Sequence, residues 1–171
     1  IRRAADYAHS RGVILAIEAI NRYETYFANT LEKALSLVEE IDHPAVKLMA
    51  DLFHMSLEER DIPRSLRMIA KHLVHVHSLN VPDEWYEALR EAAGLGSTDF
   101  RAALRTLMDI GYCGSLTMEF MPRLANPYES GALSTQSELM DVYAKQSIDY
   151  MRCVEASLTC AAPERNCQEH E

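Results

Sequence analysis

The sequence predicts an α/β fold of four parallel strands, each followed by a helix. Four short apolar runs, ILAIE, KLMAD, LVHVH and SLTME, alternate with amphipathic stretches of helical period. The connections carry no hairpin signal, which favours parallel strands joined by right-handed crossovers. Four such units are half of an eight-stranded barrel. We therefore expect a second half, from the same protein or from another copy of this chain, or else an unstable fragment.

The apolar periodicity places each element in order. We expect strands at about residues 13–18, 46–51, 73–77 and 115–119. We expect helices at about residues 1–11, 30–41, 63–72, 99–110 and 134–158. Residues 1–158 should form a single half-barrel domain, and 159–171 should be a disordered tail. The stretch 78–98 is long for a strand-to-helix connection, so we expect it to be functional.

Helix ends are marked by residues with terminal preferences. Asn29 or Thr30 can cap the second helix, and Thr98 or Asp99 can cap the fourth. Gly12 follows the first helix, as glycine often does where a helix ends in the left-handed conformation. Pro63 suits the first turn of the third helix, where its missing N–H costs nothing.

Composition narrows the classes of function. The chain has 171 residues, 48% of them hydrophobic and 25% charged, with a formal net charge of −9. Scattered Lys and Arg residues and an acidic balance disfavour a nucleic-acid partner. No apolar run approaches the roughly 20 residues of a membrane span, and the first residues do not resemble a secretion signal. We expect a cytoplasmic protein with no membrane partner, although the chain opens on Ile1 and can be part of a longer protein.

The cysteines and the acidic residues are explained without a functional site. The four cysteines have no CxxC spacing, so we expect reduced thiols. The acidic excess is assigned mainly to solvated helix faces, such as the pairs Glu39-Glu40 and Glu58-Glu59.

Each apolar run ends in a side chain that can bind a metal. These residues are Glu18, Asp51, His77 and Glu119. The carboxyl ends of parallel strands meet at one edge of a sheet, so the four side chains can converge there. Three carboxylates and one imidazole form a fairly hard ligand set, which favours Mn²⁺, Mg²⁺ or Co²⁺ over a closed structural zinc site. His75 lies two residues before His77, so we expect it to pack inside the barrel and not to bind the metal.

Five segments carry a resemblance to a known family: EAINRYETYFANT at 18–30, DLFHM at 51–55, HVH at 75–77, GLGSTDF at 94–100 and GYCGSLTMEF at 111–120. Together they resemble the xylose isomerase-like TIM barrels, the superfamily of sugar phosphate isomerases and epimerases. The resemblance is nearest to the D-tagatose/D-psicose 3-epimerase group and covers about residues 1–155. It implies the C-terminal half of a TIM (β/α)₈ barrel.

The resemblance also implies roles for residues of this chain. Its metal, Mn²⁺ first and Co²⁺ or Mg²⁺ as alternatives, would be held by the four strand-end residues named above. Glu18 and Glu119 would also exchange the proton at carbon 3 of a ketose, through a metal-stabilised enediolate. Glu24 and His54 would bind sugar hydroxyls. Asn21 and Arg22 could orient Glu24 or serve the loop alone.

The chain departs from the family pattern after His77. The epimerases carry an arginine about six residues after the metal-binding histidine, in an Asn-Arg pair that holds the substrate. This chain has Asn80-Val81-Pro82-Asp83, with the asparagine but not the arginine. Arg90, in the longer loop that follows, is a candidate to replace it as a substrate-binding residue.

Other functions remain open. A lyase of the same superfamily that acts on an inositol ketone would share proton abstraction beside a carbonyl. A barrel fragment that binds metal weakly and catalyses nothing is a further alternative. The related zinc endonucleases are disfavoured, because residues 78–98 contain no histidine and the chain is acidic. The expected partners are a small sugar and either a homo-oligomer or a missing N-terminal half.

Overall fold

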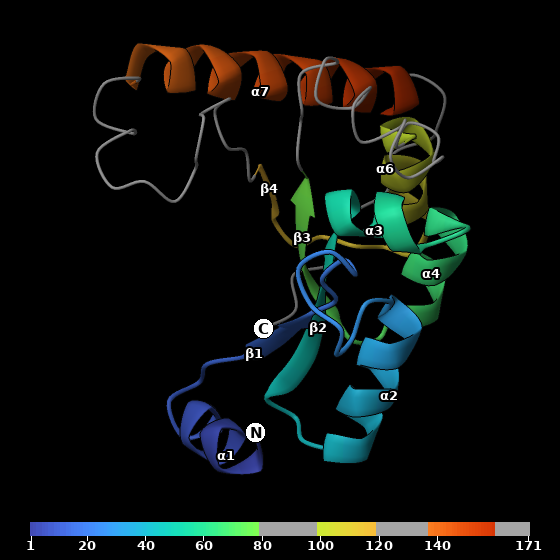
Figure 1. The fold of residues 1–171 in the computed structure, drawn as a ribbon. Coiled ribbons are helices and arrows are strands. Elements are labelled where there is room, and N and C mark those ends of the chain that lie inside the picture. Colours follow the sequence, from blue (N-terminus) through green and yellow to red (C-terminus); the bar gives the residue numbers. More distant parts are fainter. Residues whose placement is uncertain (79–98, 119–136, 160–171) are drawn as a thin grey trace.

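The computed structural model describes residues 1–78, 99–118 and 137–159. Four strands alternate with helices along this part of the chain (Figure 1). The elements are α1 (Arg2–His9), β1 (Leu15–Glu18), α2 (Leu31–Ile41), β2 (Val46–Asp51), α3 (Leu52–Glu58), α4 (Ile62–Ile69), β3 (Leu73–Ser78), α6 (Phe100–Asp109), β4 (Leu116–Met118) and α7 (Ser137–Thr159). The predicted tail lies, apart from Thr159, outside the described residues.

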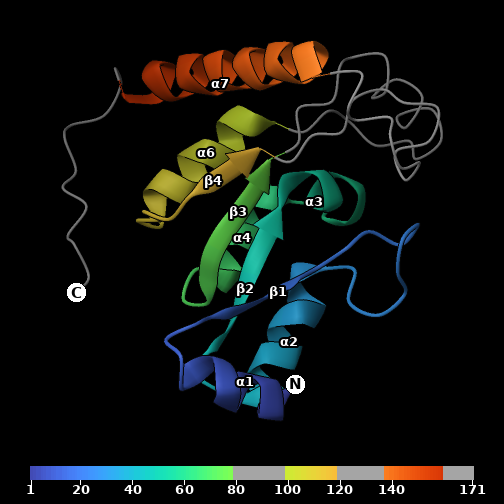
Figure 2. The same cartoon turned by 90° about the vertical axis from the view of Figure 1, so that its left-hand side faces the viewer.

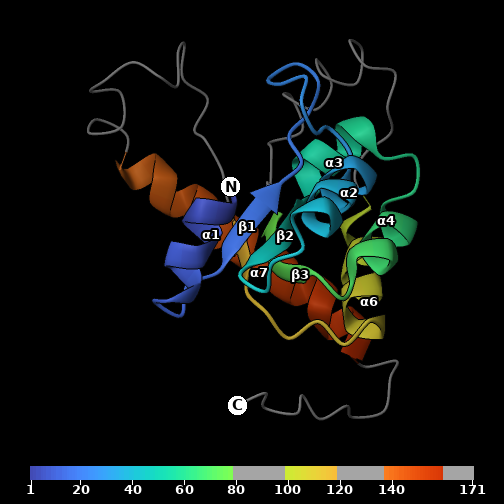
Figure 3. The ribbon, with the colours of Figure 1, turned by 90° about the horizontal axis from the view of Figure 1, so that it is seen from below.

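The strands form one parallel sheet in the order β1-β2-β3-β4. Helices α2, α4 and α6 lie along one face of this sheet, and the opposite face is turned toward the viewer in Figure 2. From below, α1 is seen beside the start of β1 (Figure 3). The predicted fold class is confirmed: an α/β fold of four parallel strands, each followed by helix.

Alternation along β2 divides its side chains between the two faces. Val46, Leu48 and Ala50 belong to the core cluster against the helices, and Leu48 is fully buried. Asp51 points the other way, as the period of two requires. It lies directly opposite His77 of β3 in the sheet register. The face opposite α2, α4 and α6 therefore carries the polar side chains of Asp51 and His77 at the strand ends.

Most predicted helix ends are confirmed by their capping contacts. Thr30 caps α2 by accepting from the backbone N–H of Lys33, and Asp99 caps α6 by accepting from that of Ala102. Pro63 lies in the first turn of α4. That helix ends at Ile69, three residues earlier than the predicted His72.

One helix was missed in the sequence. Residues 52–58 form α3 directly after β2, without any intervening loop. The Oδ1 atom of Asp51 accepts hydrogen bonds from the backbone N–H groups of Phe53 (2.7 Å) and His54 (3.3 Å), which is the contact of an N-cap residue. Asp51 is thus the last residue of a strand and the cap of a helix, and the second role was not foreseen.

The expectation of reduced thiols is wrong for Cys113, which is disulfide-bonded. Cys153, by contrast, is free and exposed. Within the described ranges, no helix has the length and apolar character needed to cross a membrane.

Candidate metal centre

Three side chains meet at the carboxyl ends of β1 and β2. Glu18, Asp51 and His54 each offer a ligand atom, and these three atoms lie within 4.8 Å of one another. Asp51 is buried, with its side chain 4% exposed, whereas Glu18 is 25% exposed. Two carboxylates this close repel one another unless a cation or a proton lies between them. The two carboxylates and their spacing therefore fit a divalent cation.

The two carboxylate oxygens of Asp51 make different contacts. Oδ1 is held by the backbone at the start of α3. Oδ2 lies 3.7 Å from Nδ1 of His77, whose side chain is 22% exposed. The ring of His77 meets that of His75 edge to face, with 5.0 Å between the centroids. Asp51 therefore has one oxygen fixed by the fold and one turned toward the predicted ligand histidine.

The structure brings together only some of the predicted site residues. Of the four predicted ligands, Glu18 and Asp51 lie in the compact cluster, and His77 lies next to it. Among the described residues, the histidine in the cluster is instead His54, with Nε2 3.8 Å from Oε1 of Glu18. Glu119 and Arg90 lie outside the described residues.

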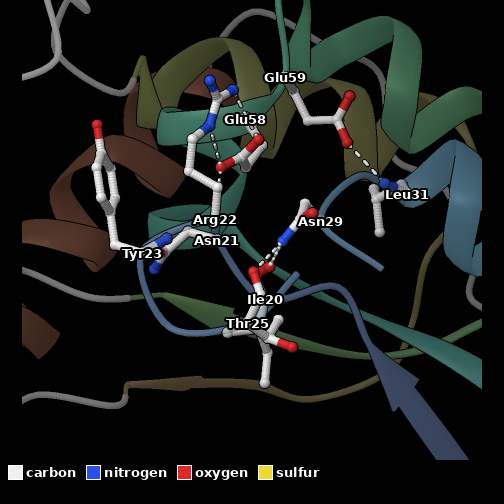
Figure 4. Close-up of polar contacts among 9 residues, drawn as sticks. All are labelled: Ile20, Asn21, Arg22, Tyr23, Thr25, Asn29, Leu31, Glu58 and Glu59. Atoms are coloured by element: carbon white, nitrogen blue, oxygen red, sulfur yellow. Dashed lines mark hydrogen bonds and ion pairs between the residues drawn. The ribbon is translucent and has the colours of Figure 1, made fainter. Parts of the chain in front are cut away.

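The loop after β1 is attached to the start and end of α3. Asn21 donates to Glu24 Oε1 (2.7 Å) and lies 2.8 Å from Nδ1 of His54. Arg22 forms a two-point ion pair with Glu58, at 2.8 Å for both side-chain contacts. The Arg22–Glu58 pair is seen in Figure 4. The loop that carries Glu24 is therefore fixed to the helix that carries His54.

Two glutamates were assigned wrongly from the sequence. Glu58 is not solvated, because its side chain is only 3% exposed and binds Arg22. Glu59 accepts from the backbone N–H of Leu31 at 2.7 Å and from the hydroxyl of Ser65 at 2.7 Å, the former shown in Figure 4. Glu58 follows His54 by four residues, so a helix here places the two side chains on one face. That spacing is informative only once α3 is known to be a helix, and it does not identify Arg22 as the partner of Glu58.

Glu58 gives the loop attachment a dependence on pH. The hydrogen bond from Arg22 holds the pKa of Glu58 below its usual range. A lowered folded-state pKa contributes stability that is present above the unfolded-state pKa and is lost as pH falls through the folded-state pKa. We expect Glu58→Gln to be less stable than the wild type by about 1 kcal/mol near neutral pH, since Arg22 is mostly exposed.

That difference should shrink at acidic pH, below the usual range of a glutamate pKa. Urea unfolding at a series of pH values measures it. Glu39→Gln, on the exposed side of α2, is the matched control and should show no such trend. A stability difference between Glu58→Gln and wild type that is equal at neutral and acidic pH would contradict the assignment.

Comparisons with known proteins identify relatives of this chain. The family model of the xylose isomerase-like TIM barrel matches residues 1–141. The D-psicose 3-epimerase of Ruminiclostridium cellulolyticum is 30% identical over 161 residues, covering 90% of this chain and 53% of the relative. The L-ribulose 3-epimerase of Methylomonas sp. is 30% identical over 156 residues, covering 89% and 52%.

Solved structures give the same result. The crystal structure of D-psicose 3-epimerase with D-tagatose from Clostridium cellulolyticum H10 superimposes with a TM-score of 0.70 at 29% identity, covering 90% of this chain and 53% of that one. This chain spans about half the length of the curated relatives it matches. The family match extends over most of the chain and the four-stranded parallel sheet agrees with it, so the chain belongs to the xylose isomerase-like TIM barrel family.

Proposed function

We propose that this chain carries the metal-binding half of a sugar epimerase that inverts carbon 3 of a ketose. The observation that carries the proposal is the meeting of Glu18, Asp51 and His54 within 4.8 Å, with Glu24 tied to the same cluster through Asn21. Relatives named D-psicose 3-epimerase, L-ribulose 3-epimerase and ketose 3-epimerase support the substrate class.

The proposed ligands are Glu18, Asp51, His77 and Glu119, with Mn²⁺ as the first choice of metal. When bound, the cation withdraws electron density from the carbonyl and hydroxyl oxygens of the sugar and so acidifies the neighbouring C–H bond. The inclusion of His77 among the ligands is supported by its Nδ1 atom, which lies 3.7 Å from Oδ2 of Asp51. The inclusion of Glu119 is supported by the sequence.

The protein's own residues carry the proton transfers. A carboxylate oxygen of Glu18 takes the proton from carbon 3 on one face. The electron pair of that C–H bond forms the double bond between carbons 2 and 3, and the π pair of the carbonyl at carbon 2 moves onto its oxygen. Glu119 returns a proton to carbon 3 from the opposite face, which inverts the centre. His54 and Glu24 hold the sugar hydroxyls and keep carbon 3 between the two glutamates. Arg90 is proposed to bind the distal part of the sugar.

Turnover in D₂O tests this proposal. The 171-residue chain is loaded with Mn²⁺ and incubated with D-psicose, D-fructose and D-tagatose, and deuterium uptake is followed by mass spectrometry alongside chromatography of the epimers. We expect one deuterium per inverted molecule, because the proton returned comes from solvent-exchanged carboxyl groups. Metal bound at one equivalent with neither deuterium nor epimer formed would overturn the proposal for this chain. Loss of water from an inositol ketone in the same assay would favour the lyase.

Two histidine variants test the proposed ligand set. His77→Gln should weaken Mn²⁺ binding by about 10-fold to 100-fold, since it removes the imidazole from the proposed ligands of the metal. His54→Gln should leave the Mn²⁺ affinity within about threefold and raise the KM for the sugar instead. Isothermal titration calorimetry gives the affinity. The reverse order of effects would make His54 the ligand and remove His77 from the proposed set.

We further propose that a second half completes the barrel, from a longer chain or from another copy. The loop after β1 supports this proposal, because two of its aromatic side chains are exposed and could be covered by the second half. Tyr26 is 97% exposed and Phe27 is 71% exposed. Sedimentation of the purified chain distinguishes a monomer from an association of copies. The cytoplasmic location expected from the sequence stays a prediction.

A further inference from the structure

Asn21 is a buried amide that contacts two proposed sugar-binding residues at once. It is 1% exposed and lies in the loop after β1. Its Oδ1 atom accepts from the backbone N–H of Tyr23 at 3.0 Å. Its Nδ2 atom donates to Oε1 of Glu24 at 2.7 Å and lies 2.8 Å from Nδ1 of His54. Every polar atom of this amide is therefore engaged, and Figure 4 shows its position beside Arg22 and Tyr23.

The three contacts fix which way the amide points. A reversed amide would turn its oxygen toward the carboxylate of Glu24, where two acceptors would face each other. It would also turn its NH₂ group toward the backbone N–H of Tyr23, where two donors would meet. Both contacts are unfavourable for a buried group, so the NH₂ group faces Glu24 and His54. One of its two hydrogens is available for each acceptor.

The amide in turn fixes the tautomer of the neutral His54 ring. Because Nδ1 of His54 receives a hydrogen from Asn21, that nitrogen must carry the lone pair, and the neutral ring carries its hydrogen on Nε2. Nε2 is the atom that lies 3.8 Å from Glu18. A ring in this tautomer has a donor toward the site and no lone pair left for a metal.

We propose that Asn21 is a positioning residue, which holds Glu24 and sets His54 in the tautomer with hydrogen on Nε2, so that His54 donates to substrate and does not bind metal. The catalytic meaning of this step rests on the proposed function, but the tautomer itself does not. The sequence alone left open whether Asn21 serves the site or only the loop; the geometry points to the site.

Nitrogen NMR of the chain labelled with ¹⁵N-histidine tests the tautomer directly. At mildly alkaline pH, where imidazole is neutral, wild-type His54 should show a bare Nδ1 and a protonated Nε2, with the signals assigned by their loss in His54→Gln. A wild-type His54 with its hydrogen on Nδ1 overturns the proposal, whether or not the chain turns over sugar. This measurement needs no folded variant of Asn21.

Asn21→Asp is the informative variant because it reverses one contact and keeps another. An aspartate can still accept from Tyr23, but it would accept from His54 Nδ1 and repel Glu24. We expect the His54 tautomer to switch and the KM for the sugar to rise about 10-fold. An unchanged His54 spectrum in this variant also overturns the proposal.

Asn29→Asp is the matched control, in the same loop. Asn29 is also buried and donates through Nδ2 to the backbone oxygens of Ile20 and Thr25, at 2.9 and 2.7 Å (Figure 4). Its substitution should loosen the loop to a similar degree and leave the His54 tautomer as in the wild type. A tautomer switch in both Asn21→Asp and Asn29→Asp would show that Asn21 only stabilises the loop, and it would overturn the proposal.

Discussion

Asp51→Asn is expected to lose at least about 100-fold of the affinity of the wild type for Mn²⁺. The substitution keeps the size of a side chain that is 4% exposed and removes its negative charge. The amide oxygen can still accept from the backbone at the start of α3, so the helix cap is largely kept. The loss should therefore fall on metal binding more than on folding, as calorimetric titration and thermal unfolding would show together.

Asp61→Asn separates the two effects of that substitution. Asp61 caps α4 as Asp51 caps α3, by accepting from the backbone N–H of Arg64 at 2.9 Å. It does not belong to the cluster of Glu18, Asp51 and His54. The control should match Asp51→Asn in its small change of stability and keep the wild-type Mn²⁺ affinity. Equal affinities in the two variants would remove Asp51 from the ligand set.

Glu18→Gln is expected to lower the rate of deuterium uptake at carbon 3 by about 10³-fold or more. The glutamine keeps a neutral oxygen near the site but cannot accept the proton from the sugar. Because Glu18 is also a proposed ligand, the rate is compared at saturating Mn²⁺, with occupancy measured separately. The measurement is the single-turnover exchange of D-psicose in D₂O.

Glu39→Gln again serves as control and should exchange at the wild-type rate. The result that would contradict the role of Glu18 is a metal-saturated Glu18→Gln chain that exchanges within about threefold of the wild type. Reduced inversion with retained exchange would instead assign the base for this substrate to Glu119 and the opposite face to Glu18, since exchange needs one base and inversion needs two groups.

The strands and most helix ends could be predicted because their signals are local. A continuous apolar run such as KLMAD identifies a buried strand, and Thr30 and Asp99 carry caps that act within three residues. These features depend on the chain near each residue and little on its tertiary partners.

The predictions were wrong or incomplete where tertiary contacts determine the structure. The start of α3 has no polar stretch before it, because Asp51 supplies both the strand end and the cap. The burial of Glu58 depends on Arg22, 36 residues earlier in the chain, and no local pattern gives that pairing. Likewise, the sequence suggested that His54 follows a ligand, but its place beside Glu18 depends on where β1 and β2 lie in the sheet.

The double use of Asp51 has a consequence for ion uptake at the proposed metal site. One oxygen is already immobilised by the backbone before any ion arrives. The conformational entropy of this ligand is therefore lost during folding and not at the moment of ion uptake. At the proposed site this ligand would need no reordering when an ion binds, so the supply of metal around the protein, rather than its folding history, would govern occupancy.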